Sequence, residues 1–334
     1  MQKATMYDWA FGQLKQADIF TAIAAASLNK RLPYRAFSPV ILGRELRSDV
    51  GVFGKGHDFA TYSEIVSDQY SFGREFDATN QSLAWALSLL MGGVYLSGST
   101  PPIYTHEITF IDPATQKECL YTSIIEKAGS EYQNLLSGVF LESVTLSGSG
   151  TEMVKVALTA RARKQVTNAT GLPGVTLSTF FQSTFASWSF GPRTAPLPVS
   201  DQLINWSITL SQNPEVRFAP GASSGDERLI RYALIGMQQV TGSITMFLDN
   251  TRRNLFINGD ECALTIVLTG ISNFAHKCTI AIPIFKIASE AIVQEGNTTA
   301  YTFALNEQTV LKSASVAGSP IKITLVNDIP ALIA

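Results

Sequence analysis

Charged residues are scarce in this sequence, and their scarcity excludes several kinds of protein. Only 16% of the 334 residues are Asp, Glu, Lys or Arg, whereas an average soluble domain has about 25%. Lys and Arg are scattered without runs and the formal net charge is −2. The chain therefore lacks the basic stripe that tight binding of nucleic acid requires, and any DNA that meets it is expected to pass without being gripped.

Cysteine is also rare, with only Cys119, Cys262 and Cys278 in the chain. Their odd number, wide spacing and lack of a CxxC pair argue against a disulfide framework and against a zinc site. We expect three buried thiols in a protein that folds in a reducing cytoplasm. No metal or other cofactor is predicted.

Histidine, the usual acid–base catalyst, occurs only at His57, His106 and His276, and none has a partner at metal-ligand spacing. A catalytic pair of His276 with Cys278 is a weak candidate, because two neighbouring loop residues carry little information. The glycine-rich stretch from Gly51 to Gly56 lacks the Gly-Lys-Ser/Thr of a phosphate loop and is better explained as a turn.

Carboxylate pairs such as Asp260-Glu261 and Asp226-Glu227 stand in Gly- or Ser-rich turns, where solvated charge is ordinary. A carbohydrate-active β-sandwich enzyme stays a minor alternative, because its paired acids would be assembled only in the fold. The sequence predicts no enzyme.

Long hydrophobic runs are missing as well. The stretch from Ile19 to Leu28 is too short to span a bilayer, and the basic pair Lys30-Arg31 follows it, whereas a signal peptide carries its positive charge first. We interpret it as a short helix or an arm packed on a neighbour, with no membrane partner.

Hydrophobic residues, in contrast, make up 46% of the chain. Such a composition is typical of a subunit that hides much of its surface in an assembly, since exposed apolar surface invites association. A monomeric enzyme with a large core is the other possibility. The length exceeds that of one ordinary hydrophobic core, so two domains are expected, and one large β domain is the alternative.

Short segments rich in Val, Ile, Thr and Ser fill the chain beyond Pro33 and predict a mainly β fold. Polar and apolar residues alternate in Glu142–Leu146 and Met153–Leu158, which predicts a hairpin across Ser147–Gly150. Further strands are predicted over residues 204–210, 238–248, 263–269, 277–285 and 320–327, with a bulge or close approach at Gly242 and an edge or bulge at Pro283.

One segment has a helical period: an apolar stripe from Leu83 to Met91 follows the cap candidates Asp77, Thr79 and Asn80 and ends at Gly92-Gly93. The strongest breaker clusters are residues 171–174 and 191–198. We place a domain boundary at the second, which divides the chain into an N-terminal arm (1–49), a first domain (50–195) and a second domain (196–334).

The stretch from Asp77 to Val166 resembles the tail tube proteins of long-tailed siphophages. Its capped helix leads into a Thr-His strand (residues 104–110), a strand after Cys119, and a Gly-hydrophobic segment that opens the long hairpin. The strand-Gly-strand of residues 240–248 and the closing Ile-Thr-Leu-Val-Asn are also similar to that family, so the resemblance covers most of the chain from about Val50.

This resemblance implies two tandem β-sandwich domains of the tube type with a flanking helix. Their sheets would join into a β-barrel tube on oligomerisation, as three chains form a pseudo-sixfold ring and rings stack head to tail. The implied function is a structural virion protein, the conduit for DNA ejection into the host. The implied partners are further copies of the chain, tape measure protein, tail-end proteins and passing genomic DNA, in a virion tail assembled in the host cytoplasm.

Two sets of side chains are candidates for the surfaces of such a tube. The polar residues of the hairpin and of the strand at 238–248 are predicted to line the lumen: Glu142, Ser143, Thr145, Lys155, Gln238, Thr241, Ser243 and Thr245. The apolar residues of the arm have no obvious core of their own and are predicted to contact the next ring: Tyr7, Trp9, Phe11, Ile19 and Phe20.

The alternative is another phage structural or adhesion β protein, at the tail tip or decorating the capsid. Trp188, Phe190 and Trp206 would supply its aromatic pocket, but the alternation around Trp206 favours a core position.

Overall fold

Alternating polar and apolar segments form two large antiparallel sheets in a computed structural model of the chain. The structure describes residues 7–32, 36–48, 63–128, 132–167, 171–174, 178–199, 203–218, 228–247, 249–295, 298–313 and 318–333. The predicted turn at Gly51–Gly56, His57 and the pair Asp226-Glu227 lie outside these residues. The mainly β prediction is confirmed.

The first sheet contains a continuous run of eight strands, in the order β3-β4-β9-β8-β13-β16-β20-β19, which we call the long sheet. Its members in chain order are β3 (Ala36–Ser48), β4 (Ser63–Asp77), β8 (Tyr132–Ser149), β9 (Lys155–Ala162), β13 (Leu203–Ser211), β16 (Gln239–Phe247), β19 (Ser289–Glu295) and β20 (Thr298–Leu305). The predicted hairpin is confirmed as β8 and β9, although β8 is longer than expected.

The first part of β8 pairs with other strands. It lies between β7 (Thr122–Ala128) and β10 (Lys164–Thr167), and β7 continues to β1 (Tyr7–Phe11) and β2 (Lys30–Leu32). Gly138, with a φ of 61°, lies where β8 changes partners, and a Cβ there would meet Arg163 and Ile19 at 2.8 Å. Glycine is therefore required at this crossing.

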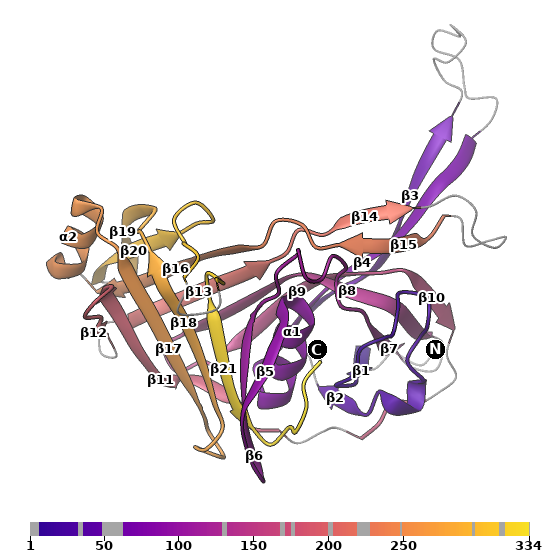
Figure 1. The fold of residues 1–334 in the computed structure, drawn as a ribbon, viewed down its shortest axis with the longest axis horizontal. Helices are drawn as coiled ribbons and strands as arrows, with labels where there is room; N and C mark the ends of the chain where they lie inside the picture. The colour runs from indigo at the N-terminus through magenta and orange to yellow at the C-terminus, as the bar shows by residue number, and fades with distance from the viewer. Residues whose placement is uncertain are drawn as a thin grey trace, which may run out of the picture.

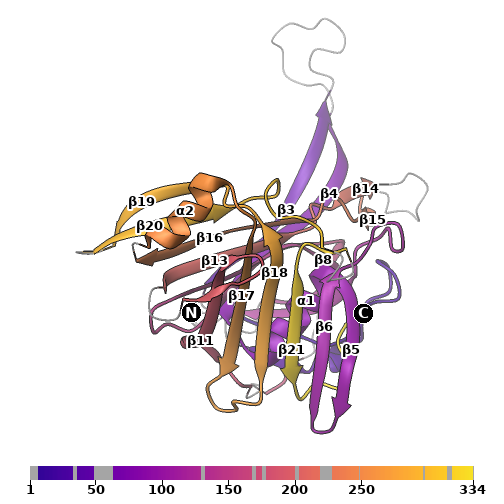
Figure 2. The same cartoon turned by 60° about the vertical axis from the view of Figure 1, so that its left-hand side comes forward.

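The second sheet has seven strands in the order β12-β11-β17-β18-β21-β6-β5, and Figure 2 shows most of them side by side. They are β5 (Gly92–Thr100), β6 (Ile103–Phe110), β11 (Phe181–Pro192), β12 (Leu197–Pro198), β17 (Cys262–Gly270), β18 (Lys277–Phe285) and β21 (Lys322–Asn327). A separate pair, β14 (Glu215–Phe218) with β15 (Ile230–Leu234), lies beside β4 (Figure 1).

Both predicted special positions are confirmed. A Cβ on Gly242 would lie 2.4 Å from the carbonyl oxygen of Ser207, so β13 approaches β16 closely there. Near Pro283 the register of β18 against β17 shifts, because Leu264 faces Ile282 whereas Cys262 faces Phe285.

The predicted helix is α1 (Asn80–Met91), capped by Thr79 and ended by Gly92 in the left-handed conformation. Every residue of α1 is buried, because the helix packs between β8, β5 and β6 (Figure 1). Its Trp85 joins an aromatic cluster in which the ring of Phe11 lies 4.8 Å away and that of Trp9 5.4 Å away. These contacts place α1 at the centre of the main core rather than on a flank.

A second helix, α2 (Asn250–Asn258), is not foreseen by the sequence pattern. Asp249 caps its start by accepting a hydrogen bond from the backbone N–H of Thr251, and Gly259 ends it in the left-handed conformation. Only Arg252 and Leu255 of this helix are buried, so it carries no apolar stripe that periodicity can detect.

The premise that the N-terminal arm has no core of its own is wrong for three of its residues. Trp9 and Phe11 are fully buried in the main core, and Ile19 is buried in a smaller core with Tyr121 and Phe140. Phe20 is exposed, with the guanidinium of Arg163 4.8 Å from its ring centre. The side chain of Tyr7 lies outside the described residues. A contact of this segment with another ring stays a prediction.

The sheets run across the predicted boundary at residue 195. β8 pairs with β13 in the long sheet, whereas β11 pairs with β17 and β21 pairs with β6 in the second sheet. One apolar core contains residues from both sides of that boundary. The division into an arm and two domains stays a prediction, and its two halves share both sheets.

Candidate assembly surfaces

The long sheet presents one apolar and one polar face. In β8 the buried Val144 and Leu146 alternate with the partly exposed Ser143, Thr145 and Ser147. β9 and β13 alternate in the same way, and the register of β16 continues the pattern, so that small polar side chains of β8, β13 and β16 stand opposite one another across the sheet. On β13 and β16 these polar positions are Asn205, Ser207, Thr209, Ser211, Thr241, Ser243 and Thr245, of which Thr245 is buried.

Hydroxyl pairs join neighbouring strands on this polar face. Ser143 and Thr159 oxygens are 2.7 Å apart, those of Thr145 and Thr209 2.8 Å, and those of Thr245 and Thr302 2.9 Å. Cross-strand pairs of this kind stabilise a sheet by roughly 0.2–1 kcal/mol each. They also occupy hydroxyl groups within the protein, so that the part of the face formed by these residues is polar but carries no charge.

The charged residues among the predicted lumen positions are paired. Glu142 accepts from Arg161 at 2.7 Å and Lys155 lies 2.9 Å from Glu152. Glu142 occupies a register shift between β8 and β9 and lines a shallow hollow with Arg44 and Gln69. Local pairing therefore limits the field of both charges.

The structure brings six of the eight predicted lumen residues onto this face: Ser143, Thr145, Lys155, Thr241, Ser243 and Thr245, with Glu142 at its margin. Gln238 is different, because it precedes β16 and donates to the carbonyl oxygen of Ile111 at 2.9 Å. Sequence reasoning missed the contribution of β13, although the alternation of Asn205, Ser207 and Thr209 with apolar neighbours carries the same signal. Whether the face lines a lumen stays a prediction.

The long sheet repeats one arrangement of strands. Its order β3-β4-β9-β8 in the first half recurs as β13-β16-β20-β19 in the second. In both halves a capped helix begins directly after the second of these strands, ends at a left-handed glycine and is followed by a hairpin, β5-β6 or β17-β18. β8 and β19 are therefore equivalent, as are β13 and β3.

The two strands at the ends of this run have free edges within the described residues. β3 pairs only with β4, and β19 pairs only with β20. Each edge exposes a large apolar side chain, Ile41 with 57% and Ile292 with 63% of its surface accessible. Unpaired edges of this length promote association with another chain.

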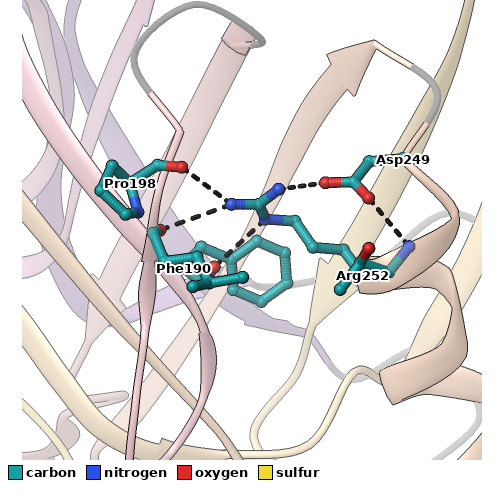
Figure 3. Close-up of polar contacts among 6 residues, drawn as sticks. Phe190, Pro198, Asp249 and Arg252 are labelled. Carbon is teal, nitrogen blue, oxygen red and sulfur yellow. Dashed lines mark hydrogen bonds and ion pairs between the residues drawn. The ribbon is translucent and has the colours of Figure 1, made fainter.

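Helix α2 holds the β19 side of the molecule in place through two adjacent arginines. Arg252, whose side chain is 5% exposed, donates to the carbonyl oxygens of Phe190 (3.1 Å) and Pro198 (2.9 Å) and is ion-paired with Asp249 (Figure 3). Arg253 donates to Glu290 of β19 at 2.9 Å. One helix thus fixes the last strands of both sheets.

The described residues considered for catalysis are buried or paired with neighbouring side chains. His276 lies 3.0 Å from the hydroxyl of Thr179 and 3.2 Å from the amide of Asn273. Burial raises the pKa of the Cys278 thiol to about 12, and Glu261 is paired with Arg193 at 2.8 Å. Within the described residues no group of three His, Cys, Asp or Glu side chains is placed to hold a metal ion.

The aromatic residues of the adhesion alternative are core residues. Trp188, Phe190 and Trp206 are buried, and the rings of Trp188 and Trp206 meet edge to face at 5.1 Å. Among the described helices, none is long and apolar enough to cross a membrane.

The described residues form a mainly β protein in which β3 and β19 each leave one sheet edge unpaired. The family model described as "Phage tail tube protein" matches residues 59–308. Because this match covers most of the chain, the protein belongs to the phage tail tube protein family. It is a structural component of the virion tail, and its family is not a known class of enzyme. A search of curated proteins finds no match.

Proposed function

We propose that three copies of this chain close into a ring with pseudo-sixfold symmetry and that rings stack head to tail into a tube. The repeat of strand order in the long sheet carries this proposal, because each chain then supplies two equivalent segments of tube wall. The free edges of β3 and β19 support closure between copies. Heterologous contacts between neighbouring copies close in the plane of the ring, whereas those between stacked rings remain open along the axis and give a filament.

The polar face of the long sheet would form the inner wall. Its Ser and Thr side chains offer DNA no fixed positive charge, and Lys155 and Arg161 are neutralised by Glu152 and Glu142. Affinity for DNA depends mainly on Lys and Arg contacts to phosphate. Such a wall would let genomic DNA move through during ejection into the host without specific binding.

The remaining partners follow from the same role. A tape measure protein would occupy the tube before DNA, and tail-end proteins would contact the first and last rings. Assembly is proposed to take place in the host cytoplasm, which fits three unpaired and buried cysteines.

Light scattering followed by negative-stain electron microscopy of the concentrated protein tests this function. We expect masses that rise in steps of three chains and hollow filaments with a regular repeat along the axis. Monomers that stay dispersed at every concentration would overturn the proposal. Rings of another stoichiometry would retain self-assembly and overturn the trimer.

A further inference from the structure

We infer that β19 of one copy pairs antiparallel with β3 of the next copy in one specific register, with Ala291 opposite Ile41. This inference rests on the proposed function and specifies which edges meet and how they align. The template for the register is the junction of β8 with β13 inside the chain.

The first step is to match β8 with β19. Phe76 and Met246 each lie three residues before the cap of their helix, and they face Val156 and Tyr301 respectively. Val156 in turn faces Leu146 of β8, whereas Tyr301 faces Ile292 of β19.

Leu146 and Ile292 therefore occupy equivalent positions in the two halves. The preceding residues, Thr145 and Ala291, are equivalent by the same register.

The second step matches β13 with β3. Ser71 and Thr241 each lie eight residues before their helix cap, and Ser71 faces Ile41 whereas Thr241 faces Thr209. Ile41 of β3 is thus the equivalent of Thr209 in β13.

Val40 lies at a register shift between Ser38 and Ile41, so the two strands match residue by residue only on the Ile41 side of that shift.

The junction inside the chain then supplies the register between chains. There Thr145 faces Thr209 and Leu146 faces Ile208. Replacing Thr145 and Thr209 by their equivalents places Ala291 opposite Ile41 of the next copy, so that Ile292 lies beside the shift at Val40.

The burial of the equivalent side chains supports the pairing of β19 with β3. Leu146 is fully buried in the chain's own junction, whereas its equivalent Ile292 is 63% exposed at the free edge. Val40 is only partly buried, against the main core. Pairing of the two edges would cover Ile292 as β13 covers Leu146, and burying such a side chain is favourable by about 25 cal/mol per Å² of apolar surface.

Cysteine cross-linking tests the register. Ile41→Cys combined with Ala291→Cys places two thiols on directly opposite residues, close enough for a disulfide after small adjustment. The matched controls, Gly43→Cys with Ala291→Cys and Ile41→Cys with Val293→Cys, shift the pair by two residues on the same face. The native cysteines are buried and should not interfere.

In assembled tubes, we expect oxidation to convert most of the first variant into covalent oligomers on a denaturing gel, and little of either control. Tubes without a cross-link in the first variant, or with stronger cross-linking in a control, would overturn the register and leave the proposed function intact. A wild-type chain that never assembles would instead refute the proposed function.

A second variant tests the edge without cysteines. Ile292→Asp should abolish rings while thermal unfolding of the monomer stays unchanged, because the side chain is exposed in the free subunit. Ile257→Asp, on α2 with 60% exposure, is the matched control and should assemble normally. Normal rings from Ile292→Asp, or loss of rings in both variants, would overturn the assignment to β19.

Discussion

An ion pair buried between β4 and β7 gives the sharpest prediction about stability. The side chains of Arg74 and Glu126 are 1% and 0% exposed and contact each other. Arg74 also donates to the carbonyl oxygen of Gly73 at 2.7 Å and lies 4.9 Å from the ring centre of Phe72. Removing one partner leaves a buried charge whose desolvation is no longer offset.

We expect Arg74→Met to lower the free energy of unfolding by about 3–5 kcal/mol, the usual cost of breaking a buried ion pair from one side. Arg74→Met combined with Glu126→Met removes both charges and retains most of the volume. The double variant should lie within about 1–2 kcal/mol of the wild type, because apolar replacement of a whole buried pair is often neutral.

Urea unfolding of the dilute subunit, followed by tryptophan fluorescence, measures both effects. Trp9 and Trp85 lie in the main core and report its loss. Glu126→Met alone completes the set of variants. The change in unfolding free energy of the double variant, minus the sum of the changes in Arg74→Met and Glu126→Met, gives the coupling energy of the pair. An unchanged midpoint for Arg74→Met, or a double variant as unstable as that sum, would refute the reasoning.

Three further predictions concern α2 and the cysteines. Arg252→Met should lower the free energy of unfolding by about 2–4 kcal/mol, since it removes charged hydrogen bonds to buried carbonyls. Arg253 is 43% exposed, so Arg253→Met should change that free energy by under about 1 kcal/mol in the same urea assay. Equal effects of the two variants would contradict the role given to Arg252. Burial raises the pKa of Asp249, but hydrogen bonds from Arg252 and from the Thr251 backbone outweigh it and hold that pKa below the ordinary value. The stabilising effect of the Asp249 carboxylate is thus present above about pH 4 and lost as pH falls through its folded-state pKa. The difference in unfolding free energy between wild type and Asp249→Asn should therefore shrink on acidification. A difference independent of pH would contradict this. Burial raises the pKa values of Cys119 and Cys278 to about 12 and of Cys262 to about 11. A thiol reagent at pH 8 should therefore label none of the three in the folded subunit and all three in urea. Rapid labelling without urea would count against the buried positions.

Local pattern was enough to predict the elements whose residues alternate or repeat strongly. β13, β17, β18 and β21 coincide with predicted strands within about two residues, because each buries one side chain in two. The stripe of α1 and its caps specified that helix in the same way. Its complete burial was not predictable, since it depends on Trp9 and Phe11 arriving from a distant segment.

Features that depend on long-range pairing could not be predicted. The few apolar residues of α2 give no stripe, although Asp249 and Gly259 are recognisable caps in retrospect. The candidate polar face was only partly predicted. Alternation identifies the outward residues of β8, β13 and β16 alike, but only long-range pairing shows that β13 lies between the other two strands. The position of Gln238 shows the limit of alternation, since its strand begins one residue later.

We propose that the Ser/Thr face of the long sheet lines a tube made of this chain alone. A cryo-electron microscopy map of assembled tubes tests it most directly. We predict that Ser143, Thr145, Thr209 and Thr241 face the central channel and that β19 continues into β3 of the next copy. A map in which this face points away from the channel would refute the lumen assignment, and one in which the long sheet ends at β19 would refute its continuation into the next copy.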